Sequence, residues 1–247
     1  MKRREAGVTL IEMLVAITLL SLLSVGMVMA IQVGLSAYTR TESKLMANRR
    51  AAGAQKILQE ELEGMVPASV MCGAGGQSGA GTRAIFFQGA SDSIWMVSTF
   101  SLQQGWRGQA QILQLFVIPG DQNGGVRLVV NEIPYSGSRA AAPLCINTMN
   151  VPNSIGKLPV FGPPRASPNS FVLADKLAYC RFSYFSPAPG MYQPPAWQPT
   201  WAAKGWPLAI RIDMAPLTPD ASRLQPITVT APIHIRRDTE KNYVLPY

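Results

Sequence analysis

Histidine is almost absent from this sequence, since His234 is the single one among 247 residues. Catalysis by a Ser-His-Asp or Cys-His arrangement would have to use it, and no Gly-x-Ser-x-Gly turn or other nucleophile motif is present. A lone histidine in a segment of strand composition is more often a surface residue than a general base. The sequence therefore predicts no catalytic residues and argues against an enzyme.

Cysteine is also scarce, and its spacing does not suit a metal. Cys72, Cys145 and Cys180 lie far apart and form no Cys-x-x-Cys pair. The stretch 121–124 has a faint likeness to a calcium loop but lacks the later acidic ligands. We expect no metal site and no cofactor.

Charged residues make up 15% of the chain, against about 25% in ordinary soluble proteins. The net charge is +8, but the basic residues after the N-terminus are scattered, with Arg49-Arg50 and Arg236-Arg237 as the only basic pairs there. No basic stripe with interleaved aromatic residues is present, so nucleic acid is not an expected partner.

The N-terminus is rich in two kinds of residue, first basic ones and then apolar ones. A basic head, residues 1–7, ends in Gly7, and an apolar run without proline extends from Val8 to Ala30. As a helix, this run is long enough to cross about 30 Å of hydrocarbon. The positive-inside rule places the basic head in the cytoplasm and the rest of the chain across the membrane. An ordinary secretory signal has a shorter apolar core and a small-x-small cleavage site, whereas a plain signal anchor remains open.

Glu12 is the unusual residue of the apolar run. A carboxylate inside a membrane span costs a few kcal/mol on insertion scales, so it normally has a partner and a role. Neither a secretory signal nor a plain anchor explains its presence five residues after Gly7.

The stretch Gly7-Val8-Thr9-Leu10-Ile11-Glu12 resembles the prepilin processing motif of type IV pilins and type II secretion pseudopilins. The resemblance implies cleavage between Gly7 and Val8 by a prepilin peptidase, and N-methylation of Val8. It also puts Glu12 at the acidic fifth position of the mature chain. The sequence departs from the motif at Val8, where phenylalanine is commonest.

Assembly into a fibre would give Glu12 a partner. Where such helices pack side by side, the N-terminal ammonium of a neighbouring subunit can compensate a buried carboxylate, whereas a wrong axial register would leave it unpaired. We therefore expect Glu12 to register subunits during assembly.

The helix is expected to continue to about Met65, because Leu58, Leu62 and Met65 share one face and Pro67 stops it. Four side chains near its end, Gln59, Glu60, Glu61 and Glu63, are expected on a solvated face.

The rest of the chain has strand composition. Strands are predicted at 84–88, 94–100, 111–118, 126–132, 171–173, 177–185, 208–214 and 227–236, separated by a Gly-rich loop at 68–81 and Pro-rich connections at 140–143, 158–168 and 186–206. No strand–helix–strand alternation is visible, so the sheet should be antiparallel.

The expected fold is α+β and type IV pilin-like, with a long N-terminal helix packed on an antiparallel β-domain. Its divisions are a cleaved leader at 1–7, a transmembrane and fibre-core half-helix at 8–30, an amphipathic periplasmic half-helix at 31–66 and a β-rich globular domain at 67–247.

The second half narrows the resemblance. The strand 177–185, the Trp-bearing loop 186–206 and the strand beginning at Pro207 resemble the J-type minor pseudopilin of type II secretion. This implies the I-, K- and H-type minor pseudopilins, the major pseudopilin and the prepilin peptidase as partners, with secreted cargo as a further candidate. It also implies an inner-membrane protein with its globular domain in the periplasm, incorporated into a pseudopilus. W-type minor pilins of type IV pili share this plan and remain the alternative.

Two further sets of residues are candidates. Translocation places the cysteines in an oxidising space, and Cys72 and Cys145, both in predicted connections, are the candidate disulfide pair. Trp197, Trp201 and Trp206 form either a partner surface or a lid over the sheet.

Overall fold

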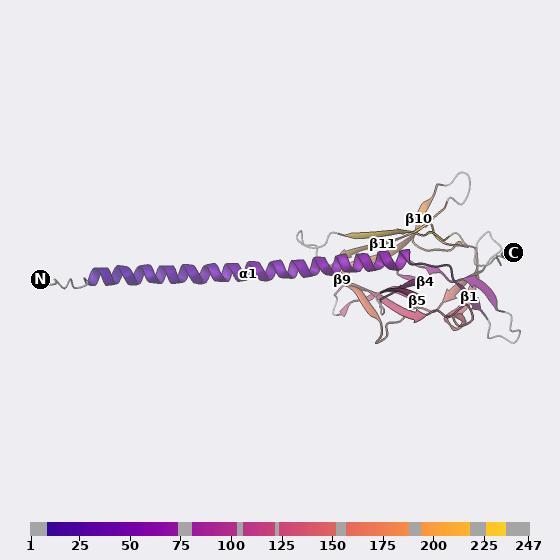
Figure 1. The fold of residues 1–247 in the computed structure, drawn as a ribbon. Coiled ribbons are helices and arrows are strands. Elements are labelled where there is room, and N and C mark those ends of the chain that lie inside the picture. The colour runs from indigo at the N-terminus through magenta and orange to yellow at the C-terminus, as the bar shows by residue number, and fades with distance from the viewer. Residues whose placement is uncertain are drawn as a thin grey trace. The chain divides into compact units, whose positions relative to one another are not determined.

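The apolar N-terminal run forms the first part of one long helix. In the computed structural model, α1 spans Leu10–Glu63, which confirms the helix expected from the sequence (Figure 1). The structure describes residues 9–73, 81–102, 106–121, 124–151, 157–187, 194–217 and 226–235, without the side chains of 40, 43–52 and 106–107. The chain forms two compact units, residues 1–49 and 50–247.

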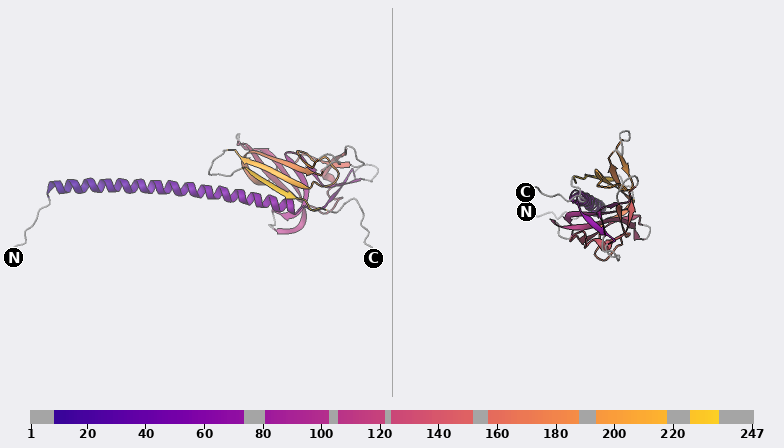
Figure 2. Two further views of the ribbon diagram at one scale, coloured as in Figure 1. Left: turned by 90° about the horizontal axis from the view of Figure 1, so that it is seen from above. Right: turned by 90° about the vertical axis from the view of Figure 1, so that its right-hand side faces the viewer.

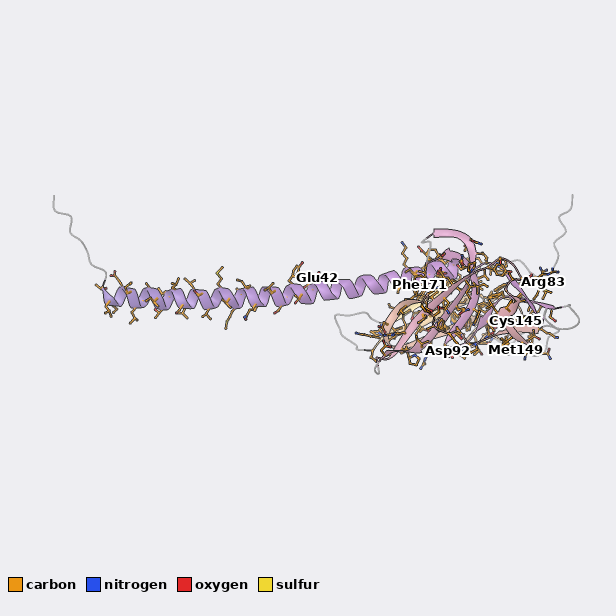
Figure 3. The ribbon with its side chains drawn as sticks, turned by 90° about the horizontal axis from the view of Figure 1, so that it is seen from below. Glu42, Arg83, Asp92, Cys145, Met149 and Phe171 are labelled. Atoms are coloured by element: carbon orange, nitrogen blue, oxygen red, sulfur yellow. A yellow bond between two sulfur atoms is a disulfide. The ribbon has the colours of Figure 1, made fainter. Side chains whose placement is uncertain are left out.

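In the first unit, α1 exposes apolar side chains all around its axis, as Figure 3 shows. The segment Leu10–Thr39 has a mean hydropathy of 2.5 and is long and apolar enough to cross a membrane. Three of its hydroxyl groups are satisfied within the helix, since Thr18, Ser21 and Ser24 donate to carbonyl oxygens three or four residues earlier. This lowers the cost of placing them in lipid.

The second unit is built on antiparallel strands, as expected from the sequence. Among the described residues, the large sheet has the order β12-β11-β9-β6-β5-β4-β3, with β10 paired to β9. Figure 2 shows the strands of this unit from two further sides. The bounds are β3 (Gln88–Gly89), β4 (Ser93–Ser101), β5 (Trp106–Pro119), β6 (Val126–Pro134), β9 (Phe171–Ser186), β10 (Ala196–Gln198), β11 (Ala209–Pro216) and β12 (Ile227–Pro232).

Two hairpins lie outside this sheet. One pairs β1 (Ser69–Cys72) with β2 (Thr82–Ile85), and the other pairs β7 (Cys145–Asn150) with β8 (Lys157–Phe161), after the short 3-10 helix η2 (Ala142–Leu144). These elements correct the sequence analysis, which assigned 68–81 and much of 140–168 to loops. The segments are short and interrupted by Gly or Pro, so their local composition does not predict strands. Tertiary packing stabilises them as strands.

Each face of the large sheet covers its own apolar core. Leu58 and Leu62 of α1 pack on one face with alternate residues of the strands, such as Ile94 and Met96 of β4. On the other face, the intervening Trp95 stacks on Phe161 of β8, with ring centroids 4.9 Å apart. The second hairpin is therefore part of the domain's core rather than a connection.

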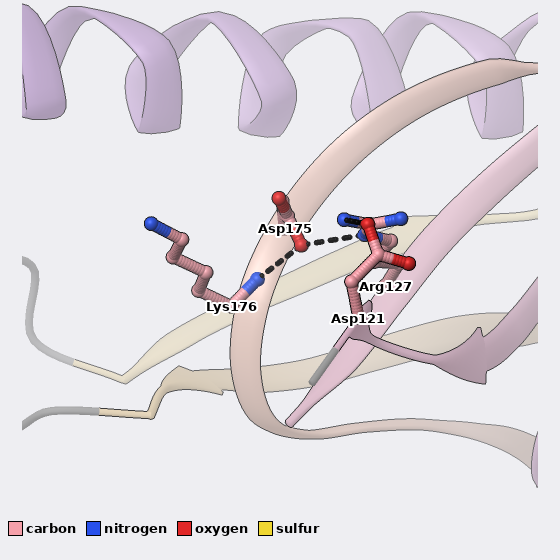
Figure 4. Close-up of polar contacts among 4 residues, drawn as sticks. All are labelled: Asp121, Arg127, Asp175 and Lys176. Carbon is pink, nitrogen blue, oxygen red and sulfur yellow. Dashed lines mark hydrogen bonds and ion pairs between the residues drawn. The ribbon is translucent and has the colours of Figure 1, made fainter. Parts of the chain in front are cut away.

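A network of charges holds the bend of β9, where the strand leaves β6 and turns towards β11 (Figure 4). Lys176 has a positive φ of 55°, and the Asp175 carboxylate accepts its backbone N–H at 2.7 Å. The same carboxylate accepts the Arg127 Nε–H at 2.8 Å, and Asp121 binds the other end of that guanidinium. These hydrogen bonds lower the pKa of Asp175 and stabilise the bend.

The position of Glu61 differs from the expectation of a solvated acidic face at the end of α1. It is fully buried, whereas Glu63 is exposed. Neither carboxylate oxygen of Glu61 has a hydrogen-bond partner within the described residues. Position 61 lies on the same helix face as Leu58 and Leu62, so packing of that face carries the carboxyl group into the core.

The pKa of Glu61 rises from an ordinary 4.5 to about 9. Burial is the main cause, and the negative charge of Glu132 on β6 adds to it, as does that of Glu60. The Ser98 hydroxyl on β4 acts in the opposite direction, although it lies outside hydrogen-bonding geometry with Glu61. Glu61 is therefore a neutral carboxylic acid at pH 7.

A raised folded-state pKa makes the domain less stable as pH rises. Because the folded state holds a proton that the unfolded state releases above about 4.5, this group costs about 3 kcal/mol at pH 7. We expect Glu61→Gln to remove a decline of about 1.4 kcal/mol per pH unit between pH 5 and 8. Urea unfolding of the full chain in detergent at several pH values measures it. Glu63→Gln is the control and should keep the decline; an unchanged slope in Glu61→Gln would contradict the assignment.

The cysteines link two of the smaller strands. Cys72 at the end of β1 and Cys145 at the start of β7 form a disulfide with Cα atoms 5.4 Å apart. Cys72 is buried in a strand and not in the loop that the sequence suggested. Cys180 is a buried free thiol, and burial, with a smaller effect of Asp213, raises its pKa to about 12.

For the exported protein the pairing stays a prediction. Under denaturing conditions without reductant, we expect one titratable thiol, Cys180, and three after reduction. Changing both Cys72 and Cys145 to Ser should lower the free energy of unfolding by about 2–4 kcal/mol, because the bond closes a long loop. Three thiols before reduction would exclude the disulfide, and Cys180→Ser is the control that should leave no thiol without reductant.

Candidate functional site

The candidate assembly site is the first turn of α1, around Glu12. The Glu12 carboxylate oxygen Oε2 accepts the backbone N–H and the hydroxyl of Thr9, both at 3.1 Å. In return, the Thr9 hydroxyl accepts the backbone N–H of Glu12 at 3.4 Å. This is a capping box, in which two otherwise unpaired N–H groups of a helix start are satisfied by each other's side chains.

The capping box satisfies only part of the carboxylate. Oε1 of Glu12 has no partner among the described residues, and Glu12 is the single charged residue between Leu10 and Thr39. The start of a helix favours a negative charge, because its N–H groups point towards it. One oxygen is thus held in place while the other remains available to a cation.

Gly7 and Val8, the predicted cleavage pair, lie outside the described residues. Their processing and the registration role of Glu12 therefore remain predictions. Sequence reasoning identified Glu12 from its cost in lipid but did not identify Thr9 as its local partner. The signal was present, because Thr and Glu at a spacing of three mark a helix start.

Trp201 belongs to the core of the β-domain. Its side chain is 7% exposed, and its indole N–H donates to the carbonyl oxygen of Gly205 at 3.0 Å. Its backbone N–H donates to the carbonyl oxygen of Gly89 at 2.9 Å, which ties this loop to the edge strand β3. These contacts agree with the lid alternative for Trp201 and leave little of the ring for a partner.

The other two tryptophans lie in different environments. Trp206 is half-buried and meets Phe87 edge-on, with ring centroids 5.7 Å apart, so it also covers the core. Trp197, on β10, packs instead against Arg211 and Phe185 on the outer side of the sheet. The three residues therefore do not form one surface, and a partner contact stays a prediction for Trp197.

The prokaryotic N-terminal methylation motif matches residues 2–28 of this chain. No curated protein matches the sequence at a significant level. The matched segment includes the basic head, the predicted cleavage pair, Glu12 and most of the apolar run.

Together, the motif and the fold define a class of protein. The prepilin-type N-terminal motif supports a type IV pilin-like protein, and the long apolar helix followed by an antiparallel β-domain is consistent with that fold. Such a motif indicates a structural subunit, processed by prepilin peptidase and assembled with other pilins, and the anchor fits a single-pass inner-membrane protein.

The positions of the tryptophans give a direct test of their roles. Trp201→Ala should lower the free energy of unfolding by about 3 kcal/mol, because it leaves a cavity in the core. Trp197→Ala, which removes a half-buried ring, should cost no more than about 1 kcal/mol. Chemical unfolding of the full chain in detergent measures both; equal losses in the two variants would contradict the division.

Proposed function

We propose that this protein is a minor pseudopilin of the J type, which assembles into the periplasmic tip of a type II secretion pseudopilus. The observation that carries the proposal is the prepilin-type N-terminus joined to this particular β-domain. Its mechanism is packing and registration of subunits, with no chemical step carried out by the chain.

Processing prepares the assembly site. Cleavage between Gly7 and Val8 creates a new ammonium at Val8, which is then methylated. Within a growing fibre, the ammonium of one subunit pairs with Oε1 of Glu12 on its neighbour, while Thr9 keeps Oε2 occupied. A subunit in the wrong register loses this pair in a medium of low dielectric constant, where the loss is costly.

The residues that carry the J-type resemblance have structural roles in the β-domain. Tyr184 is fully buried, and its hydroxyl donates to the carbonyl oxygen of Ala90 at 2.9 Å. Trp201 belongs to the same core and Trp206 packs against it, while the neighbouring Pro207 is buried. Their contacts support a domain of the proposed type, with the I-, K- and H-type minor pseudopilins and the major pseudopilin as partners in the periplasm. A W-like minor pilin of a type IV pilus is the second candidate, because it shares these features.

The processing and registration steps are tested in a host with prepilin peptidase. Wild-type protein should yield an N-terminal peptide that begins at methylated Val8, and Glu12→Gln should still insert and be cleaved but enter fibres at least tenfold less. Mass spectrometry and co-purification with fibres measure these outcomes. Glu42→Gln is the matched control, since Glu42 is an exposed carboxylate further along α1 (Figure 3). An uncleaved Met1 terminus, or normal incorporation of Glu12→Gln, would refute the respective step.

Deletion of the gene in the native host distinguishes a subunit of a secretion pseudopilus from a subunit of a type IV pilus. For a secretion subunit, exoproteins should accumulate in the periplasm while surface pili remain, and the wild-type gene should restore release. Loss of pili, with secretion unchanged, would instead establish the W-like alternative.

A further inference from the structure

The outer face of the large sheet carries an unusual set of side chains. On β9, the residues at 180, 182 and 184 point into the core, and the alternate ones, including Tyr179, Arg181 and Phe185, point outwards. Trp197 on β10 and Arg211 on β11 lie on the same side, because Trp197 is the register partner of Phe185 and contacts both Phe185 and Arg211. These five residues are called the Arg–aromatic face (strands labelled in Figure 1).

Arg211 is held in a fixed orientation. Its guanidinium carbon lies 4.2 Å from the ring centroid of Trp197, which is within the range of a cation–π interaction. Its Nε lies 3.3 Å from both the Ser183 hydroxyl and the Asp213 carboxylate. Asp213 is in turn fixed by the hydroxyl of Thr228 on β12. Both terminal Nη groups of Arg211 remain without a partner within the described part of the chain.

Arg181 is exposed, and its guanidinium lies 5.5 Å from the ring centroid of Tyr179. It forms no ion pair with any described residue, although Asp213 is its register partner on β11. Tyr179 itself is 38% exposed. The face therefore presents two oriented guanidinium groups against one carboxylate, with aromatic rings around them.

This combination suits a protein partner of negative charge. Arg, Trp and Tyr are the residues that contribute most binding energy at protein interfaces, and rings that surround a charged contact exclude water from it. Stacking restricts the arginine side chains before binding, which reduces the entropy lost on association. Lipid and nucleic-acid surfaces are instead bound by larger clusters of Lys and Arg. Residues 67–247 carry 14 Lys and Arg against 8 Asp and Glu, and this excess of positive charge also favours the approach of an acidic partner.

We propose that the Arg–aromatic face binds an acidic surface of another polypeptide, with Arg181 and Arg211 pairing with its carboxylates and the aromatic rings shielding these contacts from water. The interaction does not depend on which fibre the protein joins. It adds a lateral contact surface on the β-domain to the assembly site at the start of α1.

The test uses the full chain in nanodiscs of zwitterionic phosphatidylcholine and a random copolymer of glutamate and tyrosine as the acidic probe. At 0.15 M salt, wild-type protein should bind the probe, and Arg181→Gln should weaken binding about tenfold through loss of a charge-assisted contact. Arg211→Lys keeps the charge but loses the stacked planar group, and should weaken binding about fivefold. Arg139→Gln, an exposed arginine in the turn before η2, is the charge-matched control and should change affinity less than twofold.

Arg181 carries the test if a change at Arg211 disturbs folding, because the Arg181 side chain makes no hydrogen bond within the described chain. No binding of the probe to folded wild-type protein would overturn the proposal. An equal loss in Arg139→Gln would also overturn it, since net charge alone would then explain binding. Tighter binding to phosphatidylglycerol vesicles or to heparin, with the same dependence on Arg181, would assign the face to a lipid or a polysaccharide instead.

Discussion

The edge strand β3 of the large sheet lies close to β9 through one contact, between Gly89 on β3 and Tyr184 on β9. A Cβ atom at position 89 would lie 2.4 Å from the Tyr184 ring, so only glycine allows the two strands to approach this closely. Around it, the Tyr184 hydroxyl binds the Ala90 carbonyl oxygen, and Trp201 binds the Gly89 carbonyl oxygen through its backbone N–H. These bonds connect β9, the loop after β10 and the β3 edge. The apolar core between them is enclosed because strands distant in sequence are held together at this point.

The two notable carboxylates of the chain meet the cost of leaving water in different ways. Glu12, in the segment suited to lipid, keeps its charge-bearing group hydrogen-bonded to Thr9, so a free subunit has a local partner before assembly. Glu61, in the core of the β-domain, has no such partner among the described residues and holds a proton instead. The hydrogen bonds from Thr9 leave Oε1 of Glu12 open to a cation, whereas the bound proton makes Glu61 neutral. Under the proposed function, Glu12 is therefore the carboxylate suited to pair with the ammonium of a neighbouring subunit.

The sequence was sufficient for the helix, because its apolar and helical pattern is long, and for most strands of the large sheet, because those runs have strand composition. It was not sufficient for Glu61, which was expected in solvent because its side chain is acidic. The spacing of Leu58, Glu61, Leu62 and Met65 is that of one buried face, and only the three apolar residues were assigned to it. It also missed β1, β7 and β8, whose short segments obtain stability from the disulfide and from the Trp95–Phe161 stack. Those contacts join residues more than sixty positions apart, and no local pattern records them.

Buried and exposed side chains alternate along the second half of β9, and this limits what a sequence resemblance in the strand can identify. Tyr184, with Trp201 and Trp206, faces the core, so a pattern built on these residues reports the fold that they stabilise. The intervening residues, Arg181 and Phe185, point outwards, and substitutions there leave the core unchanged. One strand can therefore keep a family's fold while its outer residues adapt to a particular neighbour. It follows that the outward-facing residues of β9 and β11 can change without loss of core packing, whereas the buried Trp201 cannot.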